Sequence, residues 1–431
     1  MKRFLSIIPA LFLLATINPA YADDVSDLKN EIQQLKQMLQ HESAQRKALE
    51  AKVDGIEGRD EQLKQASEEG STALFDLRDD NSPFSISGGV TGVVQGTSGN
   101  KNATSGTTDK SSFASTFDLS LNTRLSENQR FIVDLEAGHG NGVNGSVNAS
   151  ATPNFDPYNT TTASQTNVTI SAMYYEGSYH DGALVVSLGK LNPQGYYDEN
   201  NFANDETAQF LSSMFVMSSG TIFTDATDYY APSLTIQYGV NDYLDVSLVG
   251  VSNNYDDLFS GSYGVAQINI KPQLLADREG NYRFYVHHDK RVYRNINTSA
   301  DESQTSFGLS FDQELTGEIG VFARAAWQDK NVTGGIDVSS AYSGGINLKG
   351  SLWGRDGDEV GIAYGTLNYN NRVAAFANQS NENHFEIYYN AEILPQVHLS
   401  PDIQYIQNVT ADNGVTYRDV TVYGVRGQFD F

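Results

Sequence analysis

The residues best suited to contact a solute lie in one long connection, residues 193–230, between two segments with strand-like alternation. This loop brings together carboxylates and carboxamides: Asp198, Glu199, Asn204, Asp205, Glu206 and Gln209. Large apolar residues such as Phe202, Phe210 and Met214 lie among them, and a loop of this length must bury such side chains. We expect it to fold into the interior of a barrel and to set its polar groups beside a narrowed passage. The alternative is an external loop that packs on its neighbours or on another subunit.

Basic side chains on other segments have the parity that would face the same interior. Arg283 and His287 alternate with the apolar residues of segment 281–291, and the same argument places Arg324 and Arg426 on the inner side. Opposite an acidic loop, these groups would create a transverse field that orients dipolar solutes. Inward arginines are also normal in any water-filled barrel, which is the simpler alternative.

The acidic residues of the loop also raise the question of a bound ion. Asp198, Glu199, Asp205 and Glu206 offer the oxygen ligands that Ca²⁺ takes. Their spacing matches no EF-hand loop, and no glycine stands at the required turn. The sequence therefore predicts no metal site and no cofactor, and these carboxylates are expected to be solvated and to repel anions.

Sequence signatures of catalysis are missing. The chain has no HExxH zinc motif, no Gly-x-Ser-x-Gly and no glycine-rich phosphate loop. An outer-membrane lipase would need a Ser/His pair on its lipid-facing wall, and His288 is outward by parity. One histidine near serines is weak evidence, so we expect a protein that is not an enzyme.

The elements that would position these groups are strands, from residue 84 to residue 431. Sixteen segments show strand-like patterning, and the even number would place both ends of an antiparallel barrel on one side. Short connections are expected at 124–128, 181–182, 241–242, 274–280, 313–317, 351–356 and 392–396. Generally longer ones alternate with them at 98–111, 139–166, 193–230, 253–261, 292–302, 329–339, 368–381 and 409–417. Short periplasmic turns alternating with longer external loops are typical of a transmembrane β-barrel, not of a soluble sandwich.

The last segment of the chain has one apolar face and one polar face. Tyr423, Val425, Phe429 and Phe431 share one parity, and polar residues such as Arg426 share the other. A terminal Phe on such a strand resembles the assembly signal of bacterial outer-membrane proteins, so Phe429 and Phe431 are assigned that role. The alternative is an ordinary edge strand of a soluble sandwich.

The N-terminal part divides into three predicted regions. Residues 1–22 have the charged start, apolar core and Ala-x-Ala site of a secretory signal peptide. Residues 23–65 carry a heptad pattern of Val, Ile and Leu, which indicates a periplasmic coiled coil that oligomerises. A single solvated helix, or one folded back on the barrel, is the alternative. Residues 66–83 are expected to be a linker.

Composition supports an envelope protein. The formal net charge of −25 argues against nucleic-acid binding. The absence of cysteine excludes a lipoprotein anchor through an N-terminal Cys and a disulfide framework. The 24 tyrosines suit membrane interfaces, where the ring is apolar and the hydroxyl is hydrated.

At residues 189–211 the chain resembles the carbohydrate-selective (OprB-like) porins of Gram-negative bacteria. The resemblance rests on Gly189-Lys190, Tyr197-Asp198, Asn204-Asp205-Glu206-Thr207 and Gln209-Phe210-Leu211. It implies a sixteen-strand outer-membrane pore for passive diffusion, with sugar selectivity in some members. The motif is also similar to cyanobacterial outer-membrane porins, which add a periplasmic anchoring domain for which this chain has no room.

The sequence thus predicts an all-β membrane protein: a 16-stranded antiparallel transmembrane β-barrel over residues 84–431, with an N-terminal α-helical coiled coil. We expect an outer-membrane porin that allows passive diffusion of small hydrophilic solutes, with carbohydrates as candidates. It would be inserted in outer-membrane lipid by the barrel assembly machinery and assembled as a homotrimer. Two alternatives stay open: a ligand-specific uptake channel, for example for an iron chelate, and an envelope tether that uses the coiled coil.

Overall fold

The computed structural model describes residues 83–101, 108–155, 168–218, 230–252, 254–258, 261–272, 275, 278–333, 338–410 and 417–431. The expected signal peptide (1–22) and coiled coil (23–65), and the linker before residue 83, lie outside the described residues.

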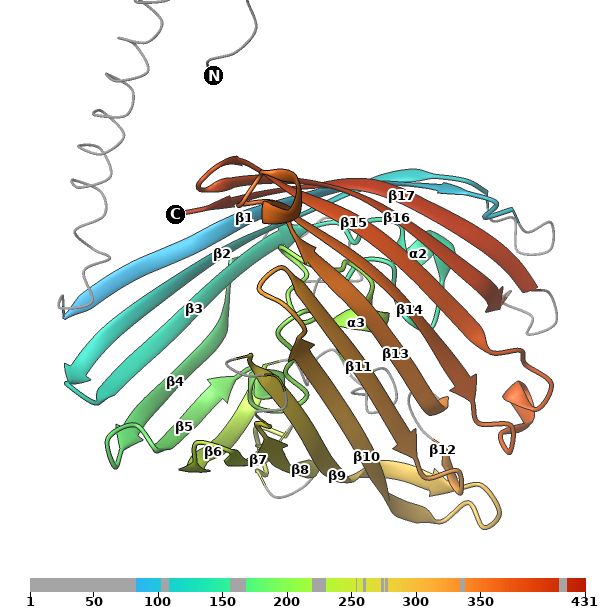
Figure 1. Cartoon of the computed structure of the whole chain (residues 1–431). Coiled ribbons are helices and arrows are strands. Elements are labelled where there is room, and N and C mark those ends of the chain that lie inside the picture. The colour runs from blue at the N-terminus through green and yellow to red at the C-terminus, as the bar shows by residue number, and fades with distance from the viewer. Residues whose placement is uncertain are drawn as a thin grey trace, which may run out of the picture. The chain divides into compact units, whose positions relative to one another are not determined.

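One antiparallel sheet contains every described strand, and it closes on itself. The strands are β1 (Phe84–Ser98), β2 (Ser111–Ser126), β3 (Gln129–His139), β4 (Thr169–Tyr179), β5 (Leu184–Leu191), β6 (Ala231–Asn241), β7 (Leu244–Ser252), β8 (Ser262–Ile270), β9 (Gly280–Asn295), β10 (Asp301–Glu314), β11 (Ile319–Gln328), β12 (Val332–Thr333), β13 (Val338–Lys349), β14 (Glu359–Tyr369), β15 (Glu382–Leu394), β16 (Val397–Thr410) and β17 (Tyr417–Asp430). Figure 1 shows the long strands side by side around the interior. Of the 17 strands, β12 is a two-residue segment that pairs with β9, while β11 pairs directly with β13. The other sixteen form the barrel wall, which confirms the predicted strand number.

Alternation along the strands separates a lipid-facing surface from the interior, as the sequence predicts. On β17, Tyr423 and Val425 are 50% and 42% exposed, whereas Arg426 is 1% exposed. On β9, Phe284 is exposed and its neighbours Arg283 and Tyr285 are buried. Apolar side chains outside and polar ones inside are what a wall between hydrocarbon and a polar lumen requires.

Turn lengths follow the predicted alternation in most hairpins, but the turns at 271–279 and 350–358 are as long as the loops at 253–261 and 329–337. Residues 395–396 connect β15 to β16, whereas residues 370–381 and 192–230 connect longer hairpins. The β9–β10 connection, residues 296–300, is shorter than the turn at 271–279, because both strands extend further than their patterning suggests.

Helices are few and brief in the part of the chain that the structure describes. They are α2 (Asn144–Val147), α3 (Ser213–Val216) and the 3₁₀ turns η2 (Pro193–Tyr196), η4 (Gly350–Trp353) and η5 (Ala374–Phe376). None of the described helices has the length and apolar character to cross a membrane.

The chain end completes the barrel seam. β17 pairs with β1 from Gly89 with Asp430 to Ser98 with Thr421. The backbone N–H of Phe431 donates to the Gly88 carbonyl at 2.9 Å, and the Gly88 N–H donates to the Phe431 carbonyl at 3.0 Å. The Phe431 ring stacks on Phe117 of β2, with the ring centroids 6.2 Å apart.

Phe431→Ala is expected to lower the yield of folded barrel several-fold, a much larger effect than its effect on the conductance of the assembled channel. The ring stacks on Phe117 beside the β1–β17 seam and also borders a cavity lined by β1 to β4. The folded fraction is measured by heat-modifiable migration on a gel. Phe385→Ala, which removes an exposed outward ring of β15, is the matched control. Equal folded yields for the two variants would show that the terminal ring is no assembly signal.

Candidate functional site

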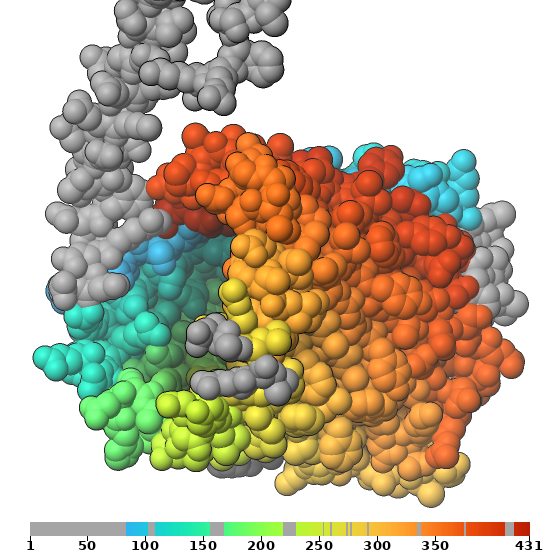
Figure 2. Space-filling model, in the orientation of Figure 1, coloured from blue at the N-terminus to red at the C-terminus, as the bar shows by residue number. Residues whose placement is uncertain are grey.

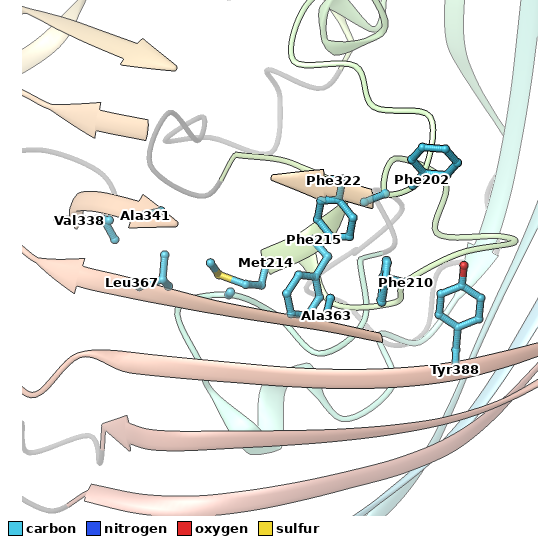
Figure 3. Packing of buried hydrophobic residues seen from close by; sticks show 12 residues of the cluster. Phe202, Phe210, Met214, Phe215, Phe322, Val338, Ala341, Ala363, Leu367 and Tyr388 are labelled. Carbon is cyan, nitrogen blue, oxygen red and sulfur yellow. The ribbon is translucent and has the colours of Figure 1, made fainter. Parts of the chain in front are cut away.

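The described part of the connection between β5 and β6, residues 192–218, folds into the barrel as predicted, and we name the connection the 192–230 loop. Its apolar residues are buried against the inner wall of β11 to β15 rather than exposed. The Phe210 ring lies 4.9 Å from Tyr388 and 5.7 Å from Phe322, centroid to centroid. Figure 3 shows Phe210, Met214 and Phe215 gathered with these wall residues. Burial of three such side chains stabilises the docked loop by several kcal/mol, at about 1.5–3 kcal/mol each.

Glycines on the inner wall make room for this packing. A Cβ at Gly320 of β11 would lie 2.2 Å from the Phe202 ring, and one at Gly365 of β14 would lie 2.5 Å from Met214. Because both distances are far below van der Waals contact, only glycine lets the loop approach the wall this closely. The glycines therefore allow the loop side chains to pack directly against the inner wall.

Arg324 of β11 is the centre of the loop's polar contacts. Its guanidinium donates to the carboxylate of Asp198 (Nε to Oδ1, 3.3 Å) and to the Asp198 carbonyl (2.9 Å). It also donates to the carbonyls of Ala203 (2.5 Å) and Phe215, and to the Asn204 side chain (3.1 Å). The planar guanidinium group thus hydrogen-bonds to loop residues from Asp198 to Phe215 at the same time.

Arg426 of β17 makes a second attachment. Its Nη1 donates to the carbonyls of Glu206 (2.7 Å) and Gln209 (2.8 Å), and its Nη2 donates to Ser400 (3.0 Å). Gln209 in turn closes the loop on itself, because its Oε1 accepts from the N–H groups of Asn204 and Asp205. The polar tip of the loop is held in one conformation by these bonds.

The base of the loop contacts β9 and β10. Arg283 forms a buried ion pair with Asp312, and its Nε lies 4.0 Å from the carboxylate of Glu199. His287 is buried, with its ring 4.8 Å from that of Tyr263. Neither side chain projects into open space.

Burial raises the pKa of the two carboxyls at the base of the loop. Desolvation raises the pKa of Asp198, opposed by the Arg324 guanidinium and by the N–H of Ser218, which donates to Oδ2 at 2.6 Å. Desolvation likewise raises the pKa of Glu199, with the Arg283 guanidinium opposing it. Both groups belong to the loop's attachment to the wall.

A second loop also folds inward, which the sequence did not lead us to expect. Residues 140–155, part of the connection between β3 and β4, pack Val143 and Val147 against inner residues of β16 and β17. Gln95 of β1 and Gln404 of β16 both donate to the Pro153 carbonyl, at 3.2 and 2.8 Å. We name this segment the 140–155 segment.

The space left by these two segments lies beside β1 to β4. A cavity of about 600 Å³ is bounded there by the strands on one side and by Phe155, Glu206, Thr207, Leu211 and Tyr230 on the other. Figure 2 shows this side of the molecule hollowed, with the inner surface of β2 to β4 visible. Among the described residues, the lining includes no Lys and no Arg. It includes five carboxylates: Asp118, Asp134, Glu136, Glu206 and Asp430.

A family model for the carbohydrate-selective porins, OprB family, matches residues 103–254 and 243–431. The chain belongs to the carbohydrate-selective porin family. It is an outer-membrane porin, a channel through which small hydrophilic solutes diffuse.

Solved structures agree with this porin on the fold. The high-pH structure of Pseudomonas putida OprB has a TM-score of 0.68 and 16% identity, with 85% of this chain and 97% of that chain covered. The low-pH structure of the same protein has a TM-score of 0.51 and 14% identity over the same shares. The outer membrane channel DcaP of Acinetobacter baumannii has a TM-score of 0.51 and 13% identity, covering 81% and 97%. A search of curated protein sequences finds no significant match.

The porin's basic residues do not form the transverse field that the sequence suggested. Arg283, His287, Arg324 and Arg426 do face inward, but each is at most 5% exposed. The three arginines bind the 192–230 loop or its neighbours beneath it, so they do not face the loop across open solvent. The prediction took inward parity for exposure. Loop carbonyls accept from Arg324 and Arg426, whereas Arg283 pairs with the carboxylates of Asp312 and Glu199.

The polar residues of the loop fall into two groups. Asp198 is buried at the base, Glu199 is partly exposed there, and Gln209 stabilises the tip. Asn204 and Asp205 are exposed, and Glu206 lines the cavity. Among the described residues no cluster of three or more His, Asp or Glu side chains has the geometry of a metal site.

The residues that sequence reasoning missed are the carboxylates on the opposite wall and on β15. Asp118 of β2 and its neighbours Asp134 and Glu136 of β3 were not singled out as candidate site residues. Cross-strand pairing places Asp118 directly opposite Glu136. Acidic residues at two successive inward positions of β3, one of them opposite Asp118 of β2, are the signal that would have found them.

Proposed function

We propose that solutes cross the porin between the 192–230 loop and the inner wall of β1 to β4, and that this passage favours cations and neutral polyhydroxyl solutes, sugars among them, over anions. The observation that carries the proposal is the cavity of about 600 Å³ with Asp118, Asp134 and Glu136 on the wall and Glu206 on the loop. On the side of β11 to β15, buried side chains of the loop and of the wall pack together.

The chemistry of the lining supports this selectivity. Carboxylates accept hydrogen bonds and carry charge, so they can replace part of the hydration of a sugar hydroxyl or of a cation. A cleft lined by one sign of charge raises the local concentration of counter-ions and lowers that of co-ions. The Tyr230 and Phe155 rings at the same cavity offer faces for the apolar side of a sugar ring.

Planar bilayers and liposomes test the proposal together. With purified porin in a KCl gradient, we expect a reversal potential of the sign that cation preference gives. Proteoliposomes are expected to swell in neutral monosaccharides faster than in sugar acids of the same size. A reversal potential of anionic sign, or faster swelling in the acids, would contradict the acidic passage, and absence of channels would contradict a diffusion pore.

We also propose a role for each part of the N-terminal region. Residues 1–22 would direct export, residues 23–65 would form a periplasmic coiled coil, and residues 66–83 would link it to the barrel. The heptad pattern supports a homotrimer, and the terminal Phe supports insertion by the barrel assembly machinery. The mass of the detergent-solubilised particle measures the oligomeric state directly.

A further inference from the structure

Two glutamates of β15 hold both inward-folded segments, and neither has a role in the contacts described so far. Glu386 accepts from the backbone N–H groups of Leu211 (Oε1, 2.5 Å) and Ser212 (Oε2, 3.0 Å). Glu382 accepts from the backbone N–H groups of Ser150 (Oε2, 3.1 Å) and Ala151 (Oε1, 3.1 Å). Each carboxylate thus engages two consecutive N–H groups of one segment, with one oxygen on each.

The spacing of the two glutamates follows from the strand. Residues 382, 384 and 386 project to the same inner face of β15, because alternate side chains of a strand share a face. His384 lies between the glutamates, with Nε2 at 2.9 Å from Glu382 Oε1 and Nδ1 at 3.4 Å from Ser212 Oγ. All three side chains are at most 1% exposed. Such burial of carboxylates is tolerated only where hydrogen bonds compensate it.

The two held segments are also joined to each other. The Phe155 N–H donates to the Leu211 carbonyl at 2.6 Å, and the Ser213 N–H donates to the Thr152 carbonyl at 3.0 Å. Phe155 and Leu211 both border the cavity of the proposed passage. The β15 carboxylates therefore fix the backbone immediately behind one side of that cavity.

We propose that Glu382 and Glu386 are positioning residues that set the width of the passage, Glu382 through the 140–155 segment and Glu386 through the 192–230 loop. The inference rests on the proposed function, in which these segments bound the path of the solute. The charged groups beside Glu386 are Asp402 of β16 and Arg426 of β17. Tyr369 of β14 donates to Glu382 at 3.2 Å.

Glu386→Gln is the informative substitution. Both carboxylate oxygens accept an N–H, whereas the amide nitrogen of Gln cannot accept, so one N–H loses its partner and meets another donor. Because a lost hydrogen bond to a charged group shifts an opening equilibrium by about tenfold or more, the loop should undock more often. The matched control is Glu314→Gln on β10, an inward carboxylate that pairs with Lys349 at 3.7 Å rather than with the described residues of either segment.

A cysteine probe reports docking independently of conductance. The native chain has no cysteine, so Val216→Cys introduces a single thiol at a site 5% exposed in the docked loop. In the full-length porin carrying this probe, Glu386→Gln is expected to raise the rate of labelling by a hydrophilic maleimide about tenfold. It should raise single-channel conductance as well, while heat-modifiable migration of the barrel stays unchanged. Glu314→Gln should change neither quantity.

The outcomes separate this inference from the proposed function. Labelling that does not increase in Glu386→Gln would overturn the positioning role. Faster labelling with unchanged conductance would leave the positioning role of Glu386 intact but would contradict the proposed passage beside the loop. Loss of the folded barrel in Glu386→Gln would assign the residue to the barrel itself and overturn the inference, and Glu382→Gln with an Ala151→Cys probe repeats the test on the other segment.

Discussion

Replacing Arg324 with methionine is expected to raise the single-channel conductance of the porin several-fold and to release the 192–230 loop from the wall. The side chain is 3% exposed, and its guanidinium donates to five acceptors on Asp198, Ala203, Asn204 and Phe215. Methionine keeps most of the length of the stem but none of the donors. It leaves the Asp198 carboxylate buried without its cation, and removing one partner of such a pair costs about 3–5 kcal/mol.

That cost is comparable to what the docked apolar side chains contribute, so the balance should move toward an undocked loop. Conductance in planar bilayers measures the widened passage, and hydrogen exchange of residues 198–218 measures the release. Arg278→Met, in the turn at residues 271–279, removes the same charge without touching the loop and serves as control. If exchange of residues 198–218 in the Arg324 variant equalled that of the control, Arg324 would not be what holds the loop.

The barrel itself is predictable from sequence because its physical requirement is local. Each strand must alternate between lipid and lumen, so Phe284 beside Arg283 or Val425 beside Arg426 reveals the face of each residue without knowledge of its neighbours. The strand number and the closure of β17 on β1 follow from counting hairpins. The length of the β9–β10 connection was misjudged because β9 and β10 extend beyond the residues whose patterning indicated a strand.

The interior is less predictable because its contacts join residues distant in the chain. Parity shows that Arg324 and Arg426 face inward, but not that carbonyls of the 192–230 loop cover them. The inward path of the 140–155 segment depends on Glu382 and Gln404, more than two hundred residues later in the chain. Its own composition, rich in Asn, Ser and Gly, resembles that of an ordinary external loop.

The charge of the passage depends on which side of the loop stays open. The arginines lie under the loop, so the open side presents mainly the carboxylates of β2 and β3. A net charge of −25 for the whole chain would not by itself decide selectivity, because charges outside the passage are screened over about 8 Å at physiological ionic strength. Local carboxylates should therefore dominate the selectivity.

Neutralising this wall with Asp118→Asn, Asp134→Asn and Glu136→Gln together is expected to lower the cation-to-anion permeability ratio several-fold. Asp118 is exposed and Asp134 is partly exposed, and both line the cavity. Glu136 also lines it, at the position of β3 directly opposite Asp118 in the β2–β3 register. All three replacements keep the shape of the side chain and change only its charge. The reversal potential in a KCl gradient should move toward zero, and the uptake of sugar acids should rise relative to neutral sugars.

A control with the same change in total charge distinguishes a local effect from a global one. Asp256→Asn, Asp257→Asn and Glu302→Gln also remove three negative charges, at exposed positions in and beside the β7–β8 and β9–β10 connections. Because these residues do not line the cavity, the reversal potential of this control variant should stay near that of the native porin. Equal shifts in the two triple variants would mean that the potential of the whole surface, rather than the β2–β3 wall, selects the solute. An unshifted wall variant would place the path of ions elsewhere in the barrel.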